Sequence, residues 1–161
     1  MIYITDMKDD SLLEYEERWA IVRSLKNPMY GLKQITALAP SRELYQWFLE
    51  ERDAFRWTQD AFDEIYVPRF LKEFGAEAQK ALDELEALEK AGKRIVLTCF
   101  CPSEERCHRS IVAGIMQYSG RFDVRTAEGK DYSFYGKMLE DIQKQQDPPA
   151  RRRVIRRHEK D

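Results

Sequence analysis

The sequence predicts a single three-layer α/β domain, with a mostly parallel central sheet flanked by helices. Residues 94–100 form a continuous apolar and β-branched run, as expected of a central strand that is buried on both faces. Helical and strand patterns alternate around this run, and that order favours parallel strands joined by crossover helices. At 161 residues the chain has room for one core of this kind.

The other expected strands are short. Ile2 to Asp6 and residues 122–126 are rich in apolar residues next to polar ones, and both read as strands. Residues 32–38, which precede Pro40, predict a further strand. Residues 12–25 show no clean period and are left open between helix and loop.

Helices are expected where apolar residues recur at helical spacing and capping signals stand at the ends. Ser41 is placed to cap a helix that begins at Arg42. After Thr58 a helix can begin, but Pro68 should kink or break it, so two short helices are an equal alternative. The remaining helices are expected at 76–91 before Gly92, at a segment marked by Ile111, Ile115 and Tyr118 before Gly120, and at 135–145.

The charge balance does not indicate a nucleic-acid-binding protein. The chain has 27 basic and 29 acidic residues, a net charge of −2. No apolar stretch reaches the roughly 18–20 residues of a membrane span, and the first residues lack a secretory signal. We therefore expect a cytoplasmic protein without a membrane partner, in which thiols stay reduced unless a metal or a redox reaction uses them. Its oligomeric state does not follow from the sequence.

The end of the chain differs from the rest. Residues 151–161 carry six basic and two acidic side chains, a formal charge of +4, and Pro148-Pro149 precedes them. We predict an α/β domain over residues 1–147 and a basic, disordered tail over residues 148–161. Such a tail either keeps the protein soluble or contacts the phosphates of a nucleic acid.

The candidate site lies between Cys99 and Ser110. All three cysteines and one of the two histidines fall in this segment, after the central strand and at the start of the next helix. Ligands of open α/β sheets bind at this edge. Three chemistries suit the segment, and each has a purely structural alternative.

The first is a zinc-like metal site with Cys99, Cys101, Cys107 and His108 as ligands. The cysteines lack the usual spacing of two intervening residues, and cysteines at a strand end are often simply buried. The second is catalysis by Cys107 with His108, in which Cys101 could resolve an oxidised Cys107. The alternative is an inert thiol.

The third is the binding of a phosphate-bearing ligand at the start of the helix. Free backbone amides there could act together with the side chains of Cys101, Ser103, Arg106, Arg109 and Ser110. The alternative pairs the two arginines with the neighbouring glutamates. A tyrosine-phosphatase loop would need cysteine six residues before Arg109, where the chain has Ser103, so a cysteinyl-phosphate mechanism is not expected.

Residues 95–101 followed by residues 107–113 resemble the signature of the domain of unknown function 488 family. In this family a hydrophobic strand ends in cysteine, and Cys-His-Arg opens the next helix; the turn at residues 40–42 adds weaker support. Many members carry Asp-Val-Arg at the second strand, where this chain has residues 35–39. The resemblance implies a compact α/β fold with the Cys-His-Arg helix beside the central strand. It implies no reaction.

Two functions therefore stay open, and the sequence does not decide whether the protein is an enzyme. One is catalysis on a phosphate-bearing or nucleic-acid-derived small molecule by Cys107 and His108. The other is non-catalytic binding of nucleic acid with help from the basic tail. Trp47, Trp57 and Tyr66 could stack on bases, although helical spacing makes them candidates for the core.

Overall fold

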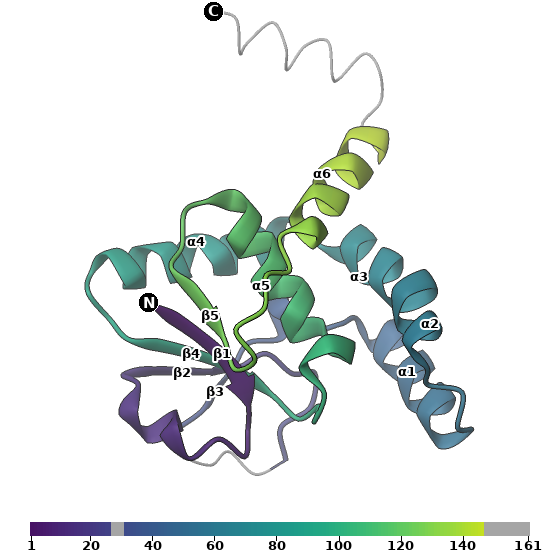
Figure 1. Ribbon diagram of the computed structural model, residues 1–161, viewed down its shortest axis with the longest axis horizontal. Helices are drawn as coiled ribbons and strands as arrows, with labels where there is room; N and C mark the ends of the chain where they lie inside the picture. Colours follow the sequence, from purple (N-terminus) through teal and green to yellow (C-terminus); the bar gives the residue numbers. More distant parts are fainter. Residues whose placement is uncertain (27–30, 147–161) are drawn as a thin grey trace, which may run out of the picture.

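The computed structural model describes residues 1–26 and 31–146, which form an α/β domain around a five-stranded, all-parallel sheet (Figure 1). The predicted fold class is confirmed, and the predicted tail lies outside the described residues. The strand order is β3-β2-β4-β1-β5. The strands are β1 (Ile2–Asp6), β2 (Glu17–Ala20), β3 (Lys33–Gln34), β4 (Ile95–Cys99) and β5 (Val124–Thr126).

Strand β4 occupies the centre of the sheet, as the apolar run predicts. It pairs with β1 on one side and β2 on the other, and all its residues are buried. Its last residue, Cys99, pairs with Asp6 at the end of β1. The sequence therefore brings a cysteine to the carboxyl edge of the sheet.

Two strand assignments need correction. The strand expected at residues 32–38 is only the two-residue β3, followed by a 3-10 turn (Thr36–Leu38). Leu38 is fully buried there, so the apolar residues of this segment pack a turn into the core and do not extend a strand. Residues 12–25, left open above, contain β2, whose first half is charged and half-buried and so lacks a strand pattern.

The helices begin where capping predicts. The Ser41 hydroxyl accepts a hydrogen bond from the Leu44 amide at 3.1 Å and opens α1. Pro68 does not break its helix, because a π-helical segment (Phe62–Tyr66) joins α2 to α3 and helical turns continue through it. The α-helices are α1 (Arg42–Asp53), α2 (Gln59–Ala61), α3 (Val67–Glu73), α4 (Ala76–Lys90), α5 (His108–Ser119) and α6 (Phe134–Gln146).

Helices α5 and α6 approach each other closely, and the small residue Gly136 makes this possible. A Cβ atom at Gly136 would lie 2.1 Å from Cβ of Tyr118. Helices α1, α2 and α3 lie together beside the sheet, on the side of α5 and α6 (Figure 1). Within the described ranges, none of the helices has the length and apolar character needed to cross a membrane.

Candidate functional site

Three sulfur atoms meet at the carboxyl end of β4. Cys99 ends the strand, Cys101 follows two residues later, and Cys107 caps α5. The three Sγ atoms all lie within 4.8 Å of one another, and those of Cys99 and Cys107 are 2.8 Å apart. All three are free thiols. The cysteine cluster predicted from the sequence is confirmed, with His108 and Arg109 beside it.

Arg109 brings a positive charge into the core below these sulfurs. Its side chain is 2% exposed, and its Nη1 donates to Cys99 Sγ at 3.1 Å and to the Cys101 carbonyl at 2.5 Å. Its Nε has no hydrogen-bond partner, and in the described part of the chain no carboxylate forms an ion pair with it. A buried charge needs compensation. Among the described residues, the thiols contact Arg109 and can supply a negative charge.

The three thiols differ in how readily they lose their protons. Burial opposes ionisation of Cys99, but hydrogen bonds from Cys101 and Cys107 and the charge of Arg109 outweigh it, so its pKa is lowered well below the usual value. Burial and the interactions with the two other sulfurs raise the pKa of Cys107. The hydrogen bond with Cys107 favours ionisation of Cys101, but the hydrogen bond to Cys99 and burial raise its pKa to about 12. One thiolate, centred on Cys99, follows.

His108 presents one ring nitrogen to the cluster. Its Nε2 lies 2.5 Å from the carbonyl oxygen of Ile21, which can only accept, so Nε2 carries the proton. Burial lowers the pKa of His108 and keeps the ring neutral. Its Nδ1 is then bare and lies 3.7 Å from Cys107 Sγ. The imidazole can accept a proton or donate a lone pair at this position.

A pocket of about 170 Å³ opens onto the cluster. Among the residues that the structure describes, its walls combine aromatic rings with three arginines and hold no acidic side chain. The lining residues are Val22, Arg23, Pro40, Tyr45, Phe48, Arg52, Trp57, Tyr66, Cys99, Phe100, Cys101, Pro102, Arg106, Cys107 and His108.

The predicted site residues take different places around this pocket. Arg106 lines it, and its Nη1 donates to the Trp57 carbonyl at 3.4 Å. Arg109 lies behind the sulfurs and is not among the lining residues, and neither is the half-buried Ser103. Ser110 is buried, and its hydroxyl donates to the Cys107 carbonyl at 2.8 Å. Its side chain therefore stabilises the first turn of α5.

The neighbouring glutamates do not neutralise the arginines. The Glu104 carboxylate is buried and accepts a hydrogen bond from the Tyr132 hydroxyl at 2.6 Å. Glu105 forms an ion pair with Lys130. The pairing of Arg106 and Arg109 with these glutamates, the alternative considered above, is therefore not found.

Sequence reasoning missed part of the pocket wall. Arg23, Tyr45 and Arg52 come from segments far from the cysteines, and their spacing carries no signal of a shared site. Trp57 and Tyr66 line the pocket and also pack against each other at 5.5 Å between ring centroids. Trp47 is outside the lining and packs partly buried against the core.

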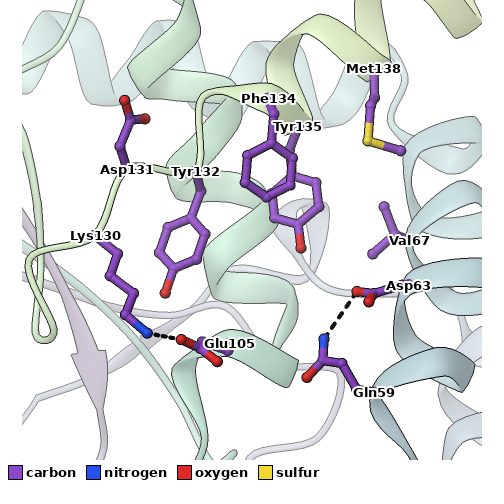
Figure 2. A pocket seen from close by; sticks show the side chains of 10 residues that line it. All are labelled: Gln59, Asp63, Val67, Glu105, Lys130, Asp131, Tyr132, Phe134, Tyr135 and Met138. Carbon is purple, nitrogen blue, oxygen red and sulfur yellow. Dashed lines mark hydrogen bonds and ion pairs between the residues drawn. The ribbon is translucent and has the colours of Figure 1, made fainter.

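A larger hollow, of about 590 Å³, lies beside this site and has a different character (Figure 2). No cysteine or histidine lines it, and its lining carries three carboxylates and one lysine. Its polar groups satisfy one another: Lys130 pairs with Glu105, and the Gln59 amide donates to Asp63 at 3.0 Å (Figure 2). Despite its size, we do not place the reactive site there.

The cysteine cluster could also hold a metal ion. Three thiolates within 4.8 Å of one another form a suitable set for zinc or another soft metal. His108 Nδ1 faces this set from the Cys107 side.

Comparison with known protein families gives one match. Residues 2–120 match the DUF488-N3a family, described as the active DUF488-N3 subclade. Comparisons with curated proteins and with solved structures find no match. The matched segment contains the first four strands, the whole thiol cluster and all of α5. The chain therefore belongs to the DUF488 family.

Proposed function

We propose that the chain is an enzyme that binds a phosphate-bearing small molecule in the arginine-lined pocket and acts on it through the thiol cluster. The observation that carries this proposal is Arg109, a buried cation without a carboxylate partner whose Nη1 donates to Cys99 Sγ at 3.1 Å. A protein core tolerates such a charge when an anion stands beside it. The thiolate is that anion, and thiolates are nucleophiles.

Cys107 and His108 supply the catalytic pair in this proposal. Cys107 keeps its proton in the resting site, because burial and the Cys99 thiolate raise its pKa. During the reaction this proton moves to the bare Nδ1 of His108, 3.7 Å from the sulfur, which gives a Cys107 thiolate paired with an imidazolium. The thiolate then attacks an electrophilic atom of the ligand, and the imidazolium can return the proton to the leaving group. Ile21 holds the ring in the orientation that this transfer needs. The description of the family as an active subclade supports a catalytic role.

The test is a turnover screen with nucleotides and sugar phosphates. We expect Cys107→Ser and His108→Gln each to abolish or strongly reduce the turnover that the unmodified protein shows. Arg56→Gln is the matched control, because Arg56 is an exposed arginine outside the pocket. Turnover that survives both substitutions at the catalytic pair would refute the proposal.

A metal-dependent site is the second candidate, favoured by the hydrogen bond of His108. A metal-binding imidazole usually donates its other ring N–H to a backbone carbonyl or a carboxylate, as Nε2 does toward Ile21. Cys99, Cys101, Cys107 and His108 would hold the ion, and a bound zinc would activate water or polarise the ligand. The charge of Arg109 would then offset the surplus negative charge of the thiolates.

A further inference from the structure

Phe100 is one of the residues that line the pocket. Its side chain is 58% exposed, and it lies between Cys99 and Cys101 in the chain. No aromatic ring of the described residues lies against it. Single exposed apolar side chains are common, and Phe55 is more exposed than Phe100. What distinguishes Phe100 is its place in the pocket lining, where its ring can contact a ligand with a flat apolar face.

A rigid aromatic wall belongs to the same pocket. Trp57 meets Phe48 edge to face at 4.7 Å and 84°, and it meets Tyr66 at 5.5 Å and 76°. These contacts fix the indole in place before a ligand arrives, which lowers the entropy lost on binding. The volume of about 170 Å³ is below that of a typical pocket for a whole small ligand, so it suits one ring system, with the rest of the ligand outside the pocket.

The charges of the pocket are positive and available. Arg23 donates to the carbonyls of Pro40 and Thr36, and Arg106 to that of Trp57; within the described residues no carboxylate pairs with either arginine. Arg52 forms an ion pair with its exposed neighbour Asp53 at 3.3 Å and lies over the ring of Phe48. Guanidinium groups bind phosphate through paired hydrogen bonds.

We infer that the pocket binds a mononucleotide. Its base lies against the aromatic wall and the ring of Phe100, and its phosphate lies at Arg52. Arg23 and Arg106 add positive potential from the other sides of the pocket. The inference rests on the proposed function for the presence of a phosphate, and it adds the ring and the residues that recognise each half of the ligand. It requires no thiol chemistry.

Calorimetric titration of the full chain tests this with nucleoside 5′-monophosphates, the matching nucleosides, ribose 5-phosphate and a short single-stranded oligonucleotide. We expect the mononucleotide to bind, and we expect the nucleoside and ribose 5-phosphate each to bind much more weakly. Phe100→Ala should weaken binding by about tenfold, because base stacking on one aromatic side chain has an effect of roughly that size. Arg52→Gln should weaken binding of the monophosphate and leave that of the nucleoside unchanged.

Two exposed residues outside the pocket serve as matched controls. Phe55 is 95% exposed and Arg56 is an exposed arginine, and neither lines the pocket. Phe55→Ala and Arg56→Gln should bind the nucleotide like the unmodified chain. All four substitutions are on exposed side chains, so a failure to fold is not expected to obscure the result.

The inference is overturned by absent mononucleotide binding, or by binding that ignores both Phe100→Ala and Arg52→Gln. It is also overturned if the oligonucleotide binds more tightly than the mononucleotide and loses that advantage when residues 151–161 are deleted, since this assigns a polymer. The proposed function can fail separately. If turnover does not depend on Cys107 but the Cys107→Ser protein still binds the nucleotide, the catalytic role is refuted and the ligand assignment is kept.

Discussion

Arg109 reaches under the thiol cluster and donates to Cys99 Sγ at 3.1 Å, and among the described residues no carboxylate shares its charge. The relationship works in both directions. The guanidinium stabilises a thiolate in the core, and the thiolate in turn stabilises the buried guanidinium.

Arg109→Met should suppress the thiolate. Without the cation the pKa of Cys99 rises, so the thiolate contribution to ultraviolet absorbance near neutral pH should fall, by up to about tenfold for each unit by which the pKa comes to exceed the pH. Arg109→Lys keeps the charge and should retain much of the signal, which separates charge from shape. Circular dichroism checks that both variants fold. An unchanged thiolate signal in Arg109→Met would contradict the pairing.

The metal candidate makes its own prediction. Protein purified without chelators should contain a stoichiometric soft metal, and Cys101→Ser or His108→Gln should lose it, because each removes a ligand from the set. Ser103→Ala is the control, since Ser103 lies nearby and outside the ligand set. Elemental analysis with thiol counting measures both quantities. Metal-free protein with three freely reacting thiols would eliminate this candidate.

Tyr132→Phe should destabilise the fold. The Tyr132 hydroxyl donates a hydrogen bond at 2.6 Å to the buried carboxylate of Glu104. Glu104 is the first residue of the 3-10 turn that ends at Arg106, just before Cys107. Removing this donor leaves a buried carboxylate underpaired, at a cost of about 1–3 kcal/mol in the free energy of unfolding. Urea denaturation measures the change.

The control for this hydrogen bond is Tyr118→Phe. It removes a comparable bond, from the Tyr118 hydroxyl to Glu140 at 3.0 Å, but at the surface. Water replaces the lost partner there, so the change should stay within about 0.5 kcal/mol. Equal effects of the two substitutions would show that burial of Glu104 has no energetic consequence.

Gly136→Ala should force α5 and α6 apart. The added Cβ would lie 2.1 Å from Cβ of Tyr118, where neither helix can yield without moving its backbone. We expect a loss of about 1–3 kcal/mol in the free energy of unfolding. Lys137→Ala, an exposed position one residue along the same helix, should change stability by about 0.5 kcal/mol or less. Thermal unfolding compares the two, and a Gly136→Ala protein as stable as the original would disprove the close approach.

Asp9 should contribute to the acid sensitivity of the protein. Burial opposes its ionisation, but hydrogen bonds from Ser11, Thr5 and Tyr3 outweigh this and lower its pKa. The unfolded chain then binds more protons than the folded chain, so this stabilisation is present above about pH 4 and is lost as the pH falls through the lower folded pKa.

Asp9→Asn tests this assignment, because an amide cannot titrate and cannot accept all of these hydrogen bonds. The variant should be less stable than the original at neutral pH, and the difference should shrink below about pH 4. Unfolding in urea across this pH range measures it. A difference that stays constant with pH would show that the hydrogen bonds do not depend on the charge of Asp9.

The central strand and the helix caps could be predicted from the sequence because each depends on residues that are close together in the chain. The apolar run of β4 needs only its own residues to show burial on both faces, and Ser41 caps α1 through an amide three residues away. The three cysteines could be placed together because a strand end and the following helix start must meet at one edge of a parallel sheet. The sequence thus determined the central strand, the helix caps and the thiol cluster.

The surroundings of that cluster were decided by tertiary structure. Arg23 and Arg52 reach the pocket from β2's exit and from α1, and no spacing in the chain links them to Cys107. The same holds for Glu104, for which pairing with arginine was one alternative: its carboxylate accepts from Tyr132, which follows α5 and β5 in the chain. Long-range packing chooses such partners, because the charge and shape that a side chain meets depend on which distant segments fold against it.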